Sequence, residues 1–290
     1  MKKLISKNFI AAFILSIIFI SAQQPKPKAK APAKSKTETK IPAPPKDQLV
    51  EMQTQYGRMV IRLYNETPYH RDNFIKLVKQ GFYDSLLFHR VIREFMIQGG
   101  DPVSKNAPSD VILGNGEVGY QIQPEFNPNL IHKRGALAAA RTDNPLKESS
   151  GCQFYIVQGR KFPMTDLTNF RNSVNFQAKT KLLQDVTNSD SVKAKIDDFK
   201  IRGDKDGLHN FMVGLQPKID ELYKKIEYYY TPSQLNTYAT VGGAPHLDMN
   251  YTVFGEVIEG LQVIDSIAAN TVDQNNRPFK DIRMTVKLLK

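Results

Sequence analysis

The sequence is poor in the residues on which much catalytic and metal-binding chemistry depends. It has a single cysteine, Cys152, in 290 residues, so an intramolecular disulfide is excluded and the fold must rely on its buried core. An apolar run follows Cys152 and predicts a buried, unreactive thiol rather than a nucleophile. The five histidines lack metal-ligand spacing, and there is no evident carboxylate pair or nucleophile elbow. Metal-dependent and nucleophilic catalysis therefore have no support in the sequence.

Basic charge is abundant, but its distribution does not indicate a nucleic-acid-binding protein. The formal net charge is +11, and ten of the lysines lie within the first 46 residues. No basic run is interleaved with aromatic residues, as is typical of a nucleic-acid interface. We therefore expect no nucleic-acid partner.

The first 22 residues have the pattern of a secretory signal peptide. Three lysines precede an apolar run at residues 9–20, which is short for a transmembrane span, and the small residues Ser21 and Ala22 follow it. We expect an exported protein, periplasmic or extracellular, with no membrane span after cleavage at Ala22. The alternative is an uncleaved segment that anchors the protein to a membrane.

Residues 23–48 predict a disordered linker. They consist largely of Pro, Lys, Ala, Ser and Thr, without aromatic residues, and so cannot bury enough apolar surface to become ordered. An extended, charged tether is the expected result. Ordered structure is expected over residues 49–290.

From residue 49 the apolar pattern predicts a mainly β domain. Alternation on both sides of Tyr56-Gly57 predicts a β-hairpin, and a helix is expected from Pro68 to Gly81. A second helix is expected at residues 261–268. Further short strands are expected at residues 86–89, 96–98, 136–140, 154–157, 251–257 and 284–289. Many short strands with one early and one late helix indicate a closed β-barrel.

Residues 160–243 break the β pattern. Apolar residues recur at three- and four-residue steps from Leu167 to Val186 and from Phe211 to Tyr230, which predicts two amphipathic helices. We therefore predict an α-helical insertion, 160–243, whose two apolar stripes bury each other.

One glycine motif fits a dinucleotide-binding pattern but lacks its context. Residues 114–119 read GNGEVG, which matches G-x-G-x-x-G. That pattern must open a helix whose N-terminus meets the pyrophosphate, yet Pro124 and Pro128 follow in a loop-like or strand-like stretch. A glycine-rich surface loop is the better interpretation.

Three ordered blocks carry a specific resemblance. They are FHRVIREFMIQGGDP at residues 88–102, GALAAAR at 135–141 leading to GCQFYI at 151–156, and YTVFGEVIEG at 251–260. Together they resemble the cyclophilins, with Cys152 where serine is usual. The resemblance covers residues 49–290 apart from the insertion. It implies an eight-stranded closed antiparallel barrel capped by two helices. It also implies peptidyl-prolyl cis-trans isomerisation of proline-containing polypeptides, without a cofactor or metal.

The resemblance also implies a role for individual residues. Arg90 matches the catalytic arginine. The positions that match substrate-binding residues are Phe95, Met96, Gln98, Ala140, Arg141, Gln153, Tyr155, His246, Leu247 and Tyr251. Taken singly, most of these would be core or surface residues, but the spacing of Arg90, Met96 and Gln98 favours a functional site.

Two positions depart from the eukaryotic pattern. Tyr251 stands where many eukaryotic members have histidine and bacterial members often have tyrosine. His246 stands where eukaryotic members often have tryptophan, whose indole N–H contacts cyclosporin. We therefore expect only weak binding of a cyclosporin-type inhibitor.

The physical chemistry of proline isomerisation suits such residues. Rotation about an X-Pro bond meets a barrier of about 20 kcal/mol because amide resonance is lost, and no bond to a nucleophile is needed. An apolar pocket can hold the proline ring, and a fixed guanidinium can stabilise the electron density that the twisted amide gains.

The leading interpretation is an exported isomerase that acts on X-Pro bonds during folding. A proline-binding chaperone without essential catalysis is one alternative. Another is a scaffold whose helical insertion recruits partners. Because both flanks of the insertion contain matched positions, we expect it at the rim of the groove, where it tunes substrate choice rather than catalysis.

Overall fold

The structure is a computed structural model that describes residues 48–289. The predicted signal peptide and almost all of the predicted linker lie outside these residues. Within the described range, no helix combines the length and the apolar character needed to cross a membrane.

An antiparallel sheet of eight strands forms the centre of the molecule, as the sequence predicts. Gly57, at a φ of +126°, lies at the turn of the first hairpin, where other residues would be strained. The order across the sheet is β10-β1-β2-β9-β6-β8-β4-β3. The strands are β1 (Gln48–Thr54), β2 (Gly57–Leu63), β3 (Phe88–Ile92), β4 (Met96–Gly99), β6 (Ala136–Ala139), β8 (Phe154–Val157), β9 (Val253–Glu259) and β10 (Met284–Leu288).

The expected closed barrel is wrong, because the sheet is open. Strands β3 and β10 lie at opposite ends of the order and form no ladder with each other. The segments before them meet at an isolated bridge between Leu87 and Arg283, beside a bond from the Phe88 N–H to the Ile282 carbonyl. The bridged residues lie directly before β3 and β10, and the contact goes no further than the first residue of β3, so the overlap is too short for a ladder. The result is a curled half-barrel.

Both helices expected to cover the sheet are present. Helix α1 (Pro68–Lys79) starts with proline at its first turn and buries Phe74 and Leu77. Helix α6 (Leu261–Ala268) matches the expected bounds and buries Ile264 and Ile267. These side chains share one core with inward residues of the sheet.

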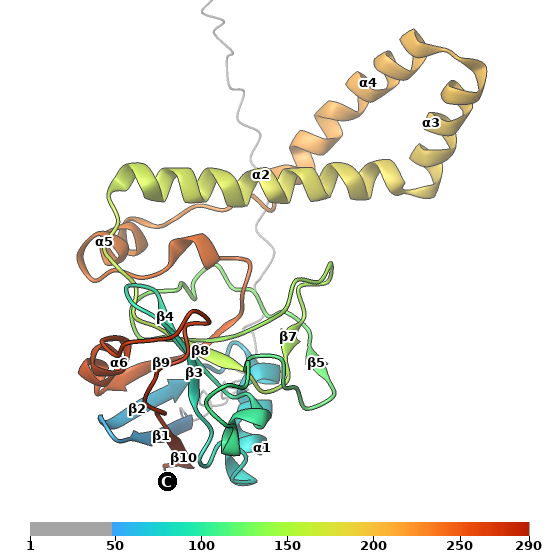
Figure 1. Cartoon of the computed structure of the whole chain (residues 1–290). Helices are drawn as coiled ribbons and strands as arrows, with labels where there is room; N and C mark the ends of the chain where they lie inside the picture. The colour runs from blue at the N-terminus through green and yellow to red at the C-terminus, as the bar shows by residue number, and fades with distance from the viewer. Residues whose placement is uncertain (1–47, 290) are drawn as a thin grey trace, which may run out of the picture. The chain divides into compact units, whose positions relative to one another are not determined.

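Four helices lie between β8 and the short 3-10 helix η2 (Pro245–Leu247). They are α2 (Met164–Asn188), α3 (Asp190–Arg202), α4 (Lys205–Tyr223) and α5 (Pro232–Thr240) (Figure 1). The sequence predicted two, so α3 and α5 were missed. Helix α5 carries a capping box between Thr231 and Gln234, with Pro232 at its first turn. These residues are a sequence pattern from which the start of α5 could have been predicted.

The second predicted helix ends at Tyr223, seven residues earlier than expected. The Asn175 side chain of α2 accepts from the Tyr228 N–H and donates to the Tyr228 carbonyl, at 2.8 and 3.0 Å. These bonds satisfy backbone groups that a continuing helix would have paired internally. Tyr228 is therefore held in an extended segment against α2.

The helices bury less apolar surface against one another than expected. Helix α3 buries none of its residues and α4 buries Ile219, whereas Phe176 is 74% exposed and Ile201 is 85% exposed. The buried residues gather at the base of the insertion. This cluster consists of Ile131, Phe162, Leu167, Val174, Tyr228, Tyr230 and Tyr238. The helices are therefore anchored mainly at one end.

Candidate active site

A hollow of about 170 Å³ opens beside strands β3, β4 and β8. Nine of the eleven residues expected from the sequence line it. These are Arg90, Phe95, Met96, Gln98, Ala140, Arg141, Tyr155, Leu247 and Tyr251. The structure thus brings together side chains from segments up to 161 residues apart, between Arg90 and Tyr251.

A directed chain of hydrogen bonds runs along one side of the hollow. Arg90 and Gln98 are direct partners across β3 and β4, and Arg90 Nη1 donates to Gln98 Oε1 at 3.2 Å. Gln98 Nε2 then donates to Gln153 Oε1 at 3.1 Å. Because the guanidinium only donates, it fixes which end of the Gln98 amide faces it. Both the cation and the amide are therefore held in place before any ligand binds.

The glycine-rich loop supports the far end of this chain. Gln153 Nε2 donates to the carbonyls of Gly114 and Gly116, at 2.9 and 2.8 Å. The N–H groups of the same two glycines point to Asp101 Oδ2. Since Asp101 already occupies these N–H groups and no helix follows, the loop is not a phosphate cradle. Its role in the fold is to hold Gln153, which does not itself line the hollow.

The floor and walls of the hollow are largely apolar. Met96 and Tyr155 are almost fully buried, while Phe95 and Leu247 are half-buried at its edge. The Tyr251 ring meets the Tyr155 ring edge-on, with ring centroids 6.0 Å apart. An apolar ring the size of proline would lose its hydration against such a surface.

Two cations border this apolar surface. The Arg141 guanidinium lies over the Tyr251 ring at 4.7 Å, which fixes both side chains. Burial lowers the pKa of Arg90 from its usual value, although a guanidinium still stays protonated in proteins. A permanent positive charge therefore faces a partly desolvated space, where its interactions are stronger than in water.

His246 lies at the rim and does not line the hollow. Its ring centroid is 5.3 Å from that of Phe95 and 5.9 Å from that of Phe170 on α2. Phe170 in turn meets Phe162 edge-on, at 5.4 Å. An aromatic row therefore leads from the hollow onto the helical insertion.

Sequence reasoning missed the polar groups behind Tyr155. Its hydroxyl lies 3.0 Å from His132 Nε2, and His132 Nδ1 lies 2.8 Å from Asp248 Oδ1. Tyr230 and Tyr238 both donate to the other Asp248 oxygen. His132 is 116 residues from Asp248, so local spacing carried no signal of this pairing.

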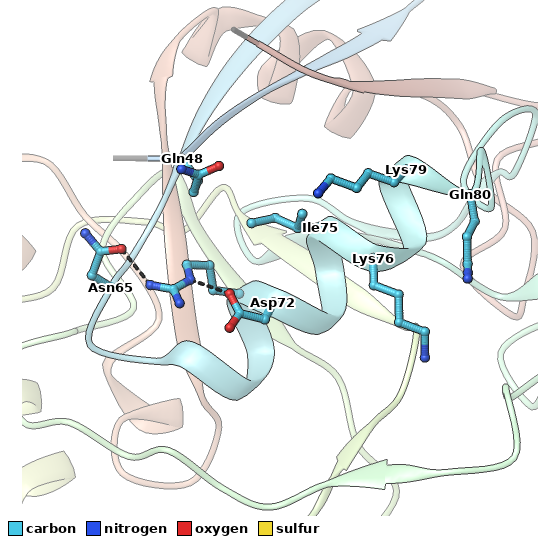
Figure 2. A pocket seen from close by; sticks show the side chains of 8 residues that line it. Gln48, Asn65, Asp72, Ile75, Lys76, Lys79 and Gln80 are labelled. Atoms are coloured by element: carbon cyan, nitrogen blue, oxygen red, sulfur yellow. Dashed lines mark hydrogen bonds and ion pairs between the residues drawn. The ribbon is translucent and has the colours of Figure 1, made fainter. Parts of the chain in front are cut away.

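Other parts of the described chain offer less chemistry. In residues 48–289 no group of three His, Cys, Asp or Glu side chains is placed to hold a metal ion. Burial raises the pKa of the Cys152 thiol to about 12, which agrees with the expected inert residue. A shallow hollow of about 630 Å³ lies along α1, where Lys76 and Lys79 point away from each other and Arg71 is paired with Asp72 (Figure 2). Asn65 and Asp72 both bind the Arg71 guanidinium, so the charge of Arg71 is already paired within this hollow.

Comparison with known proteins places the chain in one family. Residues 49–196 and 232–287 match the family described as cyclophilin type peptidyl-prolyl cis-trans isomerase. A putative peptidyl-prolyl cis-trans isomerase of Staphylococcus aureus is 29% identical over 234 residues, covering 80% of this chain and 87% of that protein.

A second relative is much longer than this chain. The putative bifunctional phosphatase/peptidyl-prolyl cis-trans isomerase of Streptococcus pyogenes is 28% identical over 237 residues, which are 80% of this chain but 37% of that protein. Among solved structures, a cyclophilin type isomerase of Cryptosporidium parvum aligns with a TM-score of 0.50 at 19% identity. That alignment covers 84% of this chain and 98% of the other, and it shows the shared fold.

Proposed function

Because the chain belongs to the cyclophilin-type peptidyl-prolyl cis-trans isomerase family and is an enzyme of that type, we propose that it accelerates X-Pro rotation in exported polypeptides while they fold. The observation that carries the assignment of the site is the Arg90 cation, held by Gln98 at the side of an apolar hollow.

The arrangement suggests how rotation is accelerated. The proline ring sits against Phe95, Met96 and Tyr155, and the preceding residue projects past Arg90. When the amide twists, its resonance is lost and electron density returns from the carbonyl oxygen to the nitrogen, where it is localised as a lone pair. The Arg90 guanidinium, already oriented by Gln98, donates to that density more strongly than to the planar amide. This selective stabilisation of the twisted state lowers the barrier.

The isomerase assignment is tested with a proline tetrapeptide and with a protein whose refolding is limited by proline isomerisation. We expect the chain to accelerate both reactions catalytically, at substoichiometric concentration. A proline-binding chaperone would bind the tetrapeptide and slow or alter refolding without accelerating the peptide reaction. That outcome would replace the enzymatic proposal with the binding one.

Export is supported by the signal-peptide pattern of residues 1–22, which lie outside the described residues. Expression of the full chain in a bacterium, followed by fractionation and N-terminal sequencing, tests it. We expect the protein outside the cytoplasm with an N-terminus at Gln23. A membrane-bound product that retains Met1 would support the anchored alternative.

We also propose that the helical insertion contributes to substrate choice. The support is the aromatic row from Phe95 through His246 to Phe170, which continues the apolar surface of the hollow onto α2. A polypeptide longer than a tetrapeptide would extend along this row. A partner-recruiting scaffold is the alternative, and a pull-down with the full chain and with a variant lacking α3 and α4 tests it.

A further inference from the structure

Four polar residues behind the hollow form one hydrogen-bonded chain that begins in the insertion. Tyr230 and Tyr238 donate to Asp248 Oδ2 at 3.0 and 2.6 Å, and Asp248 Oδ1 faces His132. His132 Nε2 then meets the hydroxyl of Tyr155, whose ring lines the hollow. All of these side chains are buried, with Asp248 2% exposed and His132 fully buried.

The direction of each bond follows from the chemistry of its ends. An ionised Asp248 only accepts, so the proton between it and His132 resides on Nδ1. In the neutral imidazole, Nε2 is then an acceptor, and Tyr155 must donate to it. The His132 N–H also donates to Asp248 Oδ1, at 2.9 Å, so the carboxylate holds both the ring and the backbone of His132.

A phenylalanine ring at position 155 would fill the same volume, so the hydroxyl needs a separate explanation. A buried hydroxyl without a partner is costly, whereas one with a single well-placed acceptor fixes the ring that carries it. Burial also raises the pKa of Tyr155 well above its usual value, so the hydroxyl stays protonated as a donor. The Tyr155 ring is therefore held through its hydroxyl by His132.

We propose that Tyr230 and Tyr238 of the insertion are positioning residues for the proline pocket. They orient Asp248, Asp248 fixes the tautomer and angle of His132, and His132 holds the Tyr155 ring against the bound proline. The proposal rests on the proposed isomerase function, because it assigns the role of Tyr155 in that site. It links the insertion to ground-state binding of proline rather than to the twisting step at Arg90.

The test measures KM and kcat for tetrapeptide isomerisation in Tyr238→Phe, Tyr155→Phe and the double variant. We expect each single change to raise KM about three- to tenfold, the size of one net hydrogen bond, with kcat changed less than about twofold. The double variant should be no worse than Tyr155→Phe, since the chain then no longer reaches the pocket. If Tyr238→Phe raised KM equally in the wild type and in Tyr155→Phe, it would act by a route other than Tyr155, such as a shift of Leu247, which is next to Asp248. That result would overturn the proposal.

One control variant and one substitute variant separate positioning from stability. Tyr228→Phe changes a buried tyrosine of the same cluster whose hydroxyl does not bind Asp248, and we expect its KM to match the wild type. If Tyr238→Phe does not fold, Tyr230→Phe takes its place.

Ring-nitrogen NMR shifts provide a readout that is independent of activity. We expect His132 as the Nδ1–H tautomer in the wild type and a changed signature in Asp248→Asn, with His132→Gln assigning the signal. An Nε2–H tautomer in the wild type would contradict the proposed chain of hydrogen bonds.

If the wild type lacks isomerase activity, the proposed function fails. If it is active but Tyr238→Phe leaves KM unchanged, this inference alone fails.

Discussion

Arg90 Nη1 donates to Gln98 Oε1 across two neighbouring strands, at 3.2 Å, and this bond fixes a cation beside an apolar pocket. Arg90 is half-buried, so its charge is partly desolvated, yet its bonds to Met96 and Gln98 both use Nη1 and leave Nη2 available within residues 48–289. A pre-oriented donor of this kind requires little reorganisation when charge develops in the twisted amide.

The first prediction concerns this cation. Arg90→Ala should lower kcat/KM for a proline tetrapeptide at least about tenfold, which corresponds to about 1.4 kcal/mol of transition-state stabilisation. Arg90→Lys should recover part of the loss, because it restores the charge but not the planar fork. Arg93→Ala, which removes an exposed arginine in the turn directly after the same strand, is the matched control and should retain wild-type activity. Unchanged activity in a folded Arg90→Ala protein would contradict the mechanism.

The second prediction concerns His89, which is buried next to Arg90. Burial lowers its pKa to about 4 in the folded protein, whereas the unfolded chain has the ordinary value near 6.5. Between these values the unfolded state binds more protons, so the free energy of unfolding falls as the pH drops from about 6.5 to 4. The loss should approach about 3 kcal/mol.

Denaturant titrations at a series of pH values test this expectation. His89→Gln should be destabilised at neutral pH but should lose less further stability on acidification than the wild type. His209→Gln changes a histidine in the exposed part of α4 and is the matched control, with the wild-type pH slope retained. Parallel pH dependence in the wild type and His89→Gln would show that other groups, such as Glu125, cause the acid sensitivity.

The limits of sequence reasoning can be seen in these residues. Arg90, Met96 and Gln98 fall within one contiguous block, so the resemblance to the cyclophilins could point to them together, and all three line the hollow. The chain from Tyr238 to Tyr155 joins segments that are distant in sequence and consists of residue types that usually serve the core. No local pattern distinguishes such tyrosines from ordinary buried ones.

In the fold, too, local features were predicted correctly and long-range features were not. The strand alternation and the helix signals at Pro68 and Leu261 are local, and the expected elements formed there. Whether the sheet closes depends on how far the edges at Phe88 and Met284 overlap, which is a long-range property, and the expectation of closure was wrong. The end of the second insertion helix was also misjudged, because the side chain of Asn175 competes for the backbone of Tyr228.

The third prediction concerns cyclosporin. His246 lies at the rim beside Phe95, where the resemblance places tryptophan in eukaryotic relatives. An imidazole offers less apolar area than an indole, so inhibition should be weak. His246→Trp should tighten it by about tenfold, the combined value of one hydrogen bond and some buried apolar area. Inhibition constants for the wild type, His246→Ala and His246→Trp provide the measurement. Tight inhibition of the wild type that His246→Ala leaves unaffected would refute the expectation.

The last prediction concerns Phe170, the point at which the aromatic row reaches the insertion. Its ring centroid lies 5.9 Å from that of His246, and the side chain is only half-buried, so part of it is accessible to a polypeptide that extends beyond the proline pocket. Phe170→Ala should leave tetrapeptide turnover within about twofold of the wild type, because that substrate is too short to use the row. Acceleration of a proline-limited refolding reaction should fall further, by about three- to tenfold, since one aromatic contact is lost.

Phe176→Ala is the matched control for this prediction, because Phe176 lies on the same helix but is 74% exposed and outside the aromatic row. It should leave both reactions unchanged.

Replacement of residues 162–242 by a Gly-Ser linker is a harsher test, because it removes Tyr230 and Tyr238 together with Phe170. Tetrapeptide turnover should then remain within a few-fold of the wild type at saturating substrate, with the raised KM expected from the loss of the bonds to Asp248. The side-chain bonds of Arg90 go to Met96 and Gln98, which lie outside the insertion, so removal of the insertion should leave Arg90 in place. If a folded linker variant nevertheless lost kcat altogether, the insertion would be part of the catalytic apparatus.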